Sequence, residues 1–330
     1  MNESSQFGEE DKMRLLPGKF EVLSDMEGVV ADLIKKHEEK RELWFPSDFL
    51  PADETTDETT YLKGVRERAK GIPLSARVAL ALNLITEEGL PHFHRLIAVH
   101  LGEDSFWKNW NYLWTAEEDR HGNVIRDYCR DSRVMNFSAV EKAQFQYVRA
   151  GFDPDWDKDP YRVFVYTSAQ ERATQISHDG TGRVCGSYEP TLQKILHSIA
   201  MDEARHYTFY RTVFGEVLKR DPDGALVSAA TILPSIDMPG HTLRNFNEYA
   251  DVVRRCGIYG PRDYIEVVEG LIKSWGIEAI CNLKESGKKA QEKILAIPQR
   301  LVKVAEYIES RSTSKRFELE FVFNKIFQMA

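Results

Sequence analysis

The sequence predicts an all-α protein, built as a four-helix bundle with additional helices. Apolar residues recur every three or four positions along most of the 330 residues, and alternating strand patterns are scarce. Segments rich in Pro, Gly, Asp and Thr separate long helical stretches. No change in composition divides the chain. We therefore expect an N-terminal extension and first helix in residues 1–35, followed by a single domain in residues 36–330.

Composition and charge exclude several classes of protein. A hydrophobic fraction of 42% can build a sizeable core, and the net charge of −8 argues against a general nucleic-acid binder. The polar, acidic N-terminus has the features of neither a signal peptide nor a transit peptide. The longest apolar runs, such as "VALALNLI" at 78–85, are too short to span a membrane. Four scattered cysteines without a C-x-x-C pair suit reduced thiols, so we expect a cytoplasmic protein.

The helices are predicted from the breaks between them. Breaks are expected at 51–60, 151–160, 178–190, 220–224 and 233–241. The long helical segments run over about 73–100, 105–130, 161–178 and 188–219. Further helices are expected at 242–257, 261–284 and 286–309.

The segment 188–219 carries charged residues inside its apolar face. The residues that share this face are Leu192, Ile195, Ile199, Glu203, His206, Tyr210, Val213 and Val217. Asp202 and Arg205 lie beside its centre. Because burying an unpaired carboxylate costs several kcal/mol, Glu203 and His206 indicate a metal site or a buried ion pair.

The segment 105–130 repeats this pattern. Its apolar face consists of Trp107, Trp110, Trp114, Glu118, His121, Ile125 and Tyr128. Both segments read acid-Glu-x-Arg-His, as "EEDRH" at 117–121 and "DEARH" at 202–206. A single Glu-x-x-His pair is a weak indication, whereas the same five-residue pattern on two buried faces is a stronger one.

Each pattern is preceded by a glutamate on the previous helix. Glu87 lies 31 positions before Glu118, and Glu171 lies 32 positions before Glu203. Two helix pairs that each offer one Glu and one Glu-x-x-His form the dinuclear iron or manganese site of ferritin-like bundles. Four carboxylates also balance the charge of two Fe²⁺ ions. The alternative is a bundle with buried Glu–Arg ion pairs, which the cost of burying charge disfavours.

Motifs in the same order and spacing resemble those of the soluble acyl-carrier-protein desaturases. They are "WFPSDFLP" (44–51), "RERAKGIP" (66–73), "ITEEGLP" (85–91), "WTAEEDRHGN" (114–123), "YTSAQERATQISH" (166–178), "DEARH" (202–206), "DPDG" (221–224), "MPGH" (238–241) and "FVFNKIF" (321–327). The resemblance covers about residues 35–330.

The resemblance implies a homodimeric ferritin-like enzyme with a di-iron site in the core of the bundle. Such an enzyme uses O₂ and electrons from ferredoxin to introduce a cis double bond into an acyl chain on acyl carrier protein, with reduction of O₂ to water. One iron would take Glu87, Glu118 and His121. The other would take Glu171, Glu203 and His206, with Glu118 and Glu203 able to bridge.

The resemblance also implies roles for neighbouring side chains. Asp202 would link His121 to Trp44 as a path for electrons, with Arg205 as a further support. Thr174 would deliver protons to bound oxygen, or its hydroxyl would bond back to its own helix. For Trp44 and Trp114, plain packing in the core is the alternative.

The resemblance places an acyl channel along the segment after Glu87. His100, near Leu96 and Val99, falls on its wall, and Trp156 would narrow its far end; a surface position is the alternative for His100. His94 lies seven positions after Glu87, or ~10 Å along a helix, which is too far for a metal ligand.

Three other functions fit parts of the pattern. A di-iron oxygenase would hydroxylate or N-oxidise a carrier-bound substrate, with His178 or His197 as an extra histidine. A ferroxidase or iron-storage protein would use the same ligands, and a radical enzyme would use a tyrosine such as Tyr128. Docking of an acidic carrier needs a basic cluster, for which Lys63, Arg66, Arg68 and Lys70 are candidates, although such residues usually form a solvated face.

Overall fold

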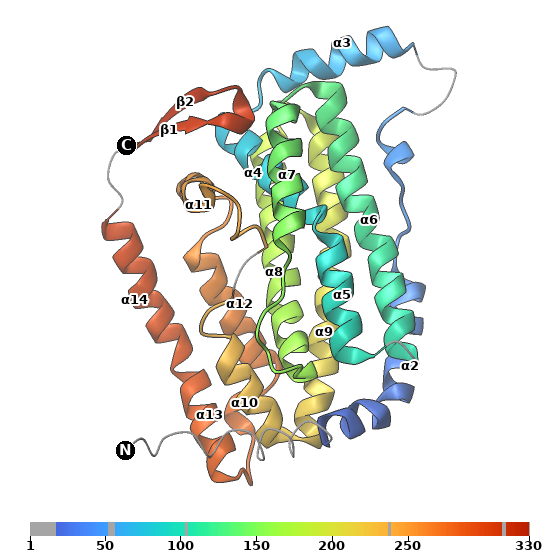
Figure 1. Ribbon diagram of the computed structural model, residues 1–330, viewed down its shortest axis with the longest axis vertical. Coiled ribbons are helices and arrows are strands. Elements are labelled where there is room, and N and C mark those ends of the chain that lie inside the picture. Colours follow the sequence, from blue (N-terminus) through green and yellow to red (C-terminus); the bar gives the residue numbers. More distant parts are fainter. Residues whose placement is uncertain (1–17, 52–56, 103–104, 237–238, 312–314, 330) are drawn as a thin grey trace.

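The protein folds into a bundle of long helices with a short hairpin near its C-terminus (Figure 1). The computed structural model describes residues 18–51, 57–102, 105–236, 239–311 and 315–329. The α-helices are α2 (Glu27–Lys40), α3 (Glu58–Ala69), α4 (Leu74–Glu87), α5 (Leu90–Leu101), α6 (Phe106–Ser132), α7 (Phe137–Ala150), α8 (Pro160–Cys185), α9 (Pro190–Arg220), α10 (Pro222–Ile232), α11 (Phe246–Arg255), α12 (Pro261–Ser274), α13 (Glu285–Leu295) and α14 (Ile297–Ser310). The remaining elements are the 3₁₀ helices η1 (Pro46–Asp48), η2 (Ile277–Ala279) and η3 (Glu320–Val322), and the strands β1 (Lys315–Leu319) and β2 (Lys325–Met329). The predicted all-α class is confirmed.

Helices α4, α6, α8 and α9 form the central four-helix bundle. α8 packs against α9, α4 packs against both α6 and α8, and α6 packs against α9. The two helices of the most extensive pairing, α8 and α9, begin with matching signals, because an acidic residue and a proline start both of them. Asp159 Oδ1 accepts a hydrogen bond from the Tyr161 amide (3.0 Å), and Glu189 Oε1 accepts one from the Thr191 amide (3.2 Å).

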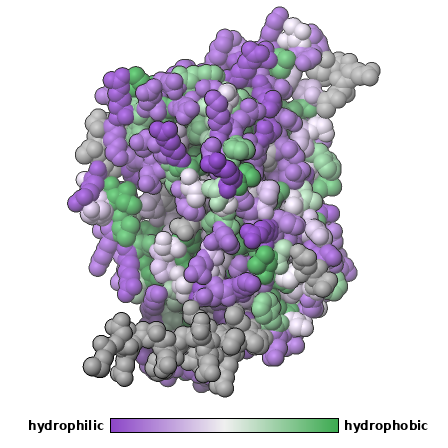
Figure 2. All heavy atoms as spheres, in the orientation of Figure 1, coloured by the Kyte–Doolittle hydropathy of each residue, from purple (hydrophilic) through white to green (hydrophobic). Residues whose placement is uncertain are grey.

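The additional helices cover this bundle. α5 packs on α6 and α8, and α2 packs on α6 and α9. α10 and α12 both contact α8, while α14 contacts α12 and stands at the outer edge of the molecule in Figure 1. The apolar faces predicted for 105–130 and 188–219 are buried along their whole length. Hydrophilic residues cover most of the face seen in Figure 2, with hydrophobic residues in small groups.

Several helix boundaries differ from the predicted ones. The segment 73–100 divides at Gly89, where an added Cβ would lie 2.6 Å from Tyr147 Cε1. The segment 286–309 divides at Ala296, just before Pro298. α8 continues to Cys185, through the break predicted at 178–190. Gly180 lies within the helix and does not form a turn. It allows close packing, because an added Cβ would lie 2.6 Å from the Ile258 carbonyl oxygen.

Helices α7 and α10 and the C-terminal hairpin lie outside the elements that the sequence predicts. β1 and β2 pair antiparallel with Phe317 opposite Phe327. Phe323 and Asn324 both have positive φ (59° and 53°), as a tight hairpin connection requires, but no glycine marks the turn. Met238, which begins the "MPGH" motif, lies outside the described residues. Among the described residues, none of the helices combines the length and apolar character that crossing a membrane requires.

Candidate metal centre

The six residues predicted as metal ligands meet in the middle of the bundle. α4 supplies Glu87 at its last position, and α8 supplies Glu171. α6 supplies Glu118 and His121, and α9 supplies Glu203 and His206. They form two groups whose ligand atoms all lie within 4.8 Å of one another: Glu87, Glu118, His121 and Glu203, and Glu118, Glu171, Glu203 and His206. Glu118 and Glu203 belong to both groups.

Each histidine turns Nδ1 towards three of the carboxylates. Nδ1 of His121 lies 3.3 Å from Glu118 Oε2, 3.7 Å from Glu87 Oε2 and 3.9 Å from Glu203 Oε1. Nδ1 of His206 lies 2.8 Å from Glu118 Oε1, 3.5 Å from Glu203 Oε2 and 3.9 Å from Glu171 Oε2. The two halves of the centre therefore have closely similar geometry.

Many of these inward-facing atoms have no hydrogen-bond partner in the described structure. The buried atoms concerned are Glu118 Oε1, Glu171 Oε2, Glu203 Oε2, His121 Nδ1 and His206 Nδ1. Leaving a buried polar atom unsatisfied costs about 1–3 kcal/mol, so five of them around one point need an explanation. Oxygen and imidazole donors of this kind suit iron or manganese. The residues therefore fit a dinuclear metal site.

Glu87 on α4 and Glu171 on α8 have pKa values that are shifted in opposite directions. Burial raises the pKa of Glu171 well above its usual range, and the neighbouring carboxylates of Glu203 and Glu118 raise it further. For Glu87, burial also opposes ionisation, but the hydrogen bond from His178 and the nearby ring of His121 lower its pKa to about 2. Without metal, Glu171 therefore holds its proton to a higher pH than Glu87 does.

A carboxylate beside each of the two shared glutamates, Glu118 and Glu203, holds the outer nitrogen of the opposite histidine. Nε2 of His121 donates to Asp202 Oδ2 (3.1 Å), and Nε2 of His206 donates to Glu117 Oε2 (2.9 Å). Asp202 Oδ2 also accepts hydrogen bonds from Trp44 Nε1 (2.9 Å) and Arg120 Nη2 (3.0 Å), and Asp202 Oδ1 is paired with Arg205. The structure thus places Asp202 between His121 and Trp44.

Comparison with known proteins identifies the family. A family model described as fatty acid desaturase matches residues 18–327. The chain belongs to the fatty acid desaturase family. Stearoyl-[acyl-carrier-protein] 9-desaturase 3 of Arabidopsis thaliana is 35% identical over 89% of this chain and 78% of that protein. Stearoyl-[acyl-carrier-protein] 9-desaturase of Gossypium hirsutum is 33% identical over 90% of this chain and 79% of that protein.

A solved structure shows the same fold. DesA2 from Mycobacterium tuberculosis H37Rv superimposes with a TM-score of 0.60 and 20% identity, over 82% of this chain and 98% of that one. The predicted ferritin-like bundle with additional helices is therefore confirmed. Both plant relatives are named as chloroplastic proteins, and the location of this desaturase stays a prediction from its sequence.

The remaining predicted side chains of the desaturase lie close to the cluster in different ways. Trp114 Nε1 donates to Glu171 Oε1 (3.1 Å), so it is more than packing. The Thr174 hydroxyl donates to the carbonyl oxygens of Gln170 (3.2 Å) and Glu171 (3.1 Å), which is the helix-bonded alternative for this residue. Nδ1 of His94 shares a hydrogen bond with Thr115 Oγ1 (2.7 Å), and the His94 ring stacks on that of Tyr112. These contacts hold His94 away from the cluster, as predicted.

Three supporting residues lie outside the predicted set: Glu117, His37 and Arg41. Glu117 has a signal in the sequence, because it occupies in "EEDRH" the place of Asp202 in "DEARH", whereas His37 and Arg41 carry no such signal. His178 is one of the two residues considered as the extra histidine of an oxygenase. His178 Nε2 donates to Glu87 Oε1 (2.7 Å), while Asn83 Nδ2 donates to His178 Nδ1 (3.3 Å).

A large apolar cavity adjoins the cluster. It has a volume of about 930 Å³, and its wall is formed by residues of α4, α8, α11, α12 and α14. Its rim includes Val304 and Ile308, which are exposed on α14. A smaller void lies directly against Glu87, Glu118 and Glu203. Thr86, Thr174 and Pro239 line both spaces, so the two spaces adjoin each other at these residues.

The side of the void that faces α5 is closed by aromatic rings. Phe93 lines the void, and its ring lies 5.3 Å from that of Phe152. Trp156 packs 6.3 Å from Phe152 and 6.0 Å from His100. Burial lowers the pKa of His100, and its Nδ1 bonds the Leu96 carbonyl oxygen (2.8 Å).

Three of the four predicted channel residues therefore lie near or within this aromatic cluster: Leu96, His100 and Trp156. The expectation for Val99 is wrong. Its side chain is 48% exposed, because α5 turns Leu96 and His100 inward and leaves Val99 on the outer face.

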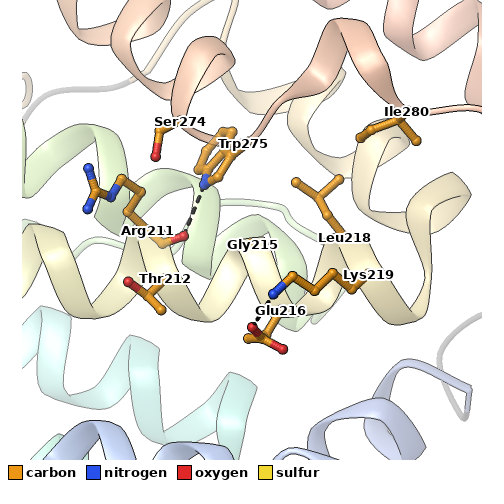
Figure 3. Close-up of a pocket in the computed structure, with 9 residues that line it drawn as sticks. All are labelled: Arg211, Thr212, Gly215, Glu216, Leu218, Lys219, Ser274, Trp275 and Ile280. Carbon is orange, nitrogen blue, oxygen red and sulfur yellow. Dashed lines mark hydrogen bonds and ion pairs between the residues drawn. The ribbon is translucent and has the colours of Figure 1, made fainter. Parts of the chain in front are cut away.

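A further pocket lies elsewhere on α9, against the end of α12 (Figure 3). Gly215 in its wall is nine positions beyond His206, or ~13 Å along the helix. Trp275 Nε1 donates to the Arg211 carbonyl oxygen there (3.0 Å), and Lys219 Nζ pairs with Glu216 Oε1 (2.6 Å). The first contact joins the residue that ends α12 to α9, and the second lies within α9 itself, so both are structural and the metal cluster remains the candidate active site.

Proposed function

We propose that this protein is an O₂-dependent di-iron desaturase that introduces a cis double bond into a fatty acyl chain carried on acyl carrier protein. The observation that carries the proposal is the set of unpartnered oxygen and nitrogen atoms at one end of a large apolar cavity. The names of the curated relatives support the carrier-bound acyl substrate. Family membership favours desaturation over hydroxylation, N-oxidation or iron storage.

In this proposal each metal ion has three principal ligands. Glu87, Glu118 and His121 hold one iron, and Glu171, Glu203 and His206 hold the other, with Glu118 and Glu203 shared. A bound di-iron centre would supply the reduction of O₂ and the removal of hydrogen from an unactivated CH₂ group. The protein contributes the geometry of the ligands and a space from which water is excluded.

Electrons would come from ferredoxin through the Trp44 side of the centre. Trp44 lies at the surface end of a hydrogen-bonded path that runs through Asp202 to His121. The Trp44 indole also stacks parallel to the His121 ring at 6.0 Å. The backbone carbonyl oxygen of Trp44 accepts a hydrogen bond from Arg120 Nη1 (2.7 Å). These contacts support a fixed path rather than loose packing.

The acyl chain would reach the metals from the α14 side. The chain would pass between Thr86 and Thr174, from the large cavity to the void beside Glu118. Beyond the metals, the rings of Phe93, Phe152 and Trp156 limit the room for the methyl end of the chain. We expect Trp156→Thr and His100→Leu to shift the preferred chain length or bond position, and unchanged product profiles would remove both residues from the channel.

The carrier and the second subunit are further parts of the proposal. The relatives support an acyl carrier protein as partner and the family resemblance supports a homodimer. The basic cluster at α3 is a poor docking surface, because three of its four side chains already have partners within the chain. Arg68 pairs with the buried Glu189, Arg66 donates to the Asp131 carbonyl oxygen and Lys70 pairs with Glu67.

The decisive experiment is a product assay. The iron-loaded protein is mixed with reduced ferredoxin, O₂ and acyl carrier proteins that bear chains of different length, and the products are identified by mass spectrometry. An alkene with two hydrogens fewer than the substrate supports the proposal. A hydroxylated product would establish the oxygenase alternative instead. A large cage in place of a dimer, together with oxidised iron and no change in the acyl chain, would establish iron storage.

A further inference from the structure

The two outer carboxylates, Glu117 and Asp202, hold Nε2 of His206 and Nε2 of His121. Both carboxylates are contacted by one short segment of the chain. Glu117 contacts His37 and Arg41, and Asp202 contacts Trp44. We call His37, Arg41 and Trp44 the α2 clamp, because the first two lie at the end of α2 and just beyond it, and the third follows shortly after. α2 itself packs against α6 and α9, the helices that carry both Glu-x-x-His pairs.

His37 is built into the core although it comes from a covering helix. Its side chain is 4% exposed. Its ring stacks on that of His206 at 5.9 Å and meets Trp110 edge-on at 5.2 Å. Its Nε2 lies 2.9 Å from Glu117 Oε2 and 3.1 Å from Oε1. Arg41 Nη1 donates to Glu117 Oε1 at 2.9 Å.

These contacts determine how His206 can act. A carboxylate only accepts hydrogen bonds, so Nε2 of His206 must carry the proton that it shares with Glu117. In the neutral form of His206, which is the form that binds a metal, the lone pair is then on Nδ1, which faces Glu118, Glu171 and Glu203.

The same three side chains, His37, Glu117 and His206, are close enough to hold an ion of their own. Their mutual contacts nevertheless have hydrogen-bond length, and His206 already directs its other nitrogen to the central cluster. A hydrogen-bonded support accounts for all of these contacts without a third metal ion.

We propose that His37 and Arg41 are positioning residues for the metal ion at His206, acting through Glu117, and that binding of this ion is coupled to the docking of α2. The proposal rests on the dinuclear site proposed above. Coupling is reciprocal: if α2 favours the metal-binding orientation of His206, then the bound metal must hold α2 in place more strongly.

The other half of the centre provides an internal comparison. Asp202 is held by Trp44 of the clamp, but also by Arg120 and Arg205 from the bundle helices α6 and α9. Glu117 receives side-chain hydrogen bonds from His206 within the bundle and otherwise from His37 and Arg41. Loss of His37 should therefore weaken one metal site and leave the other nearly unchanged.

The test measures metal binding and exchange rather than turnover. Fe²⁺ is titrated anaerobically into the full-length protein, and hydrogen exchange of residues 27–40 is followed with and without metal. We expect two ions per wild-type chain and slower exchange of α2 after loading. His37→Leu should keep one site and weaken the other by about 10- to 100-fold, the usual effect of losing an outer partner of a metal ligand. Exchange of its α2 should no longer respond to metal.

Two further variants separate positioning from a general effect on folding. His37→Gln keeps an amide donor for Glu117 and should recover part of the lost affinity. Lys36→Leu, on the exposed face of the same helix, should bind both ions as the wild type does. Two equal sites in His37→Leu, with α2 still responding to metal, overturn the inference alone. A wild-type protein that binds fewer than two ions overturns the proposed function itself.

Discussion

The two halves of the metal centre have the same ligands and different surroundings. Both consist of one Glu and one Glu-x-x-His on successive bundle helices. Glu87, in the first half, receives a hydrogen bond from His178, whose ring is in turn held by Asn83 in the wall of the large cavity. Glu171, in the second half, receives its hydrogen bond from the Trp114 indole and is fully buried. The repeated sequence produces a symmetric ligand set, and unrepeated neighbours make the two sites inequivalent.

This difference has a chemical consequence for loading. Glu87 is ionised in advance, because His178 and His121 stabilise its negative charge. The pKa of Glu171 is raised, because burial and two neighbouring carboxylates oppose a further charge. The first half is therefore ready for a cation at lower pH than the second half, where binding of an ion competes with the proton of Glu171.

The largest expected effect comes from removing a ligand that both halves share. Glu203→Ala should lower the affinity for both ions and abolish turnover, a greater loss than the roughly 10- to 100-fold cost of an outer-partner change. Glu171→Ala should remove mainly the second ion. Metal content after anaerobic loading distinguishes the two variants. Equal losses in both would mean that the halves fill together and that the comparison between them has no functional meaning.

The outer carboxylates give the next largest effect, this time on stability. Asp202→Asn leaves Arg120 and Arg205 without their buried partner charge, and breaking a buried pair costs about 3–5 kcal/mol. Glu117→Gln should cost less, because Arg41 is 23% exposed and reaches water. Urea unfolding of the two metal-free variants measures the difference. A larger cost for Glu117→Gln would reverse the assignment of which half is held more firmly.

Glu87 on α4 and Glu171 on α8 should change the free energy of unfolding with pH in opposite directions. Because the pKa of Glu87 is lowered, its ionisation adds stability that is present above about pH 4.5 and lost as the pH falls towards 2. Because the pKa of Glu171 is raised, the folded state binds its proton more tightly than the unfolded state does. That contribution is present at low pH and is lost as the pH rises above the usual range for Glu.

At pH 7, Glu87→Gln should therefore destabilise the metal-free protein, on the order of 3 kcal/mol, and Glu171→Gln should stabilise it. Unfolding free energies of the wild type and both variants from pH 4 to pH 8 check the signs. Changes of the same sign in both variants would contradict the electrostatic difference between the two halves.

What the sequence predicts here follows from how local each feature is. Glu118 with His121 and Glu203 with His206 are three apart on helices, so their shared face is a local property that periodicity reveals. His37 and His178 act across 80 and 91 positions, on Glu117 and Glu87, and no spacing in the sequence encodes such contacts. The same limit applies to Gly180, which looks like a break but allows α8 to pass close to Ile258.

The smallest expected effect concerns two threonines that flank the passage to the metals. Thr86 precedes Glu87, and its hydroxyl donates to the carbonyl oxygens of Leu82 and Asn83 (3.0 Å each). Thr174 makes the equivalent bonds on α8. Since both hydroxyls are satisfied by their own helices, Thr86→Val and Thr174→Val should each change the free energy of unfolding by no more than about 0.5 kcal/mol.

Measurements of activity can then distinguish the roles of Thr86 and Thr174, which measurements of stability cannot. If Thr174 supplies protons for the reduction of O₂, Thr174→Val should consume more O₂ per double bond formed, while Thr86→Val should keep the wild-type ratio. Measuring O₂ uptake and alkene yield in the same reaction gives this ratio directly. Equal ratios in both variants would leave Thr174 with the same role as Thr86, as part of the wall of the passage. In that case the difference between the two halves would lie in the side chains that contact Glu87 and Glu171, and not in the threonines.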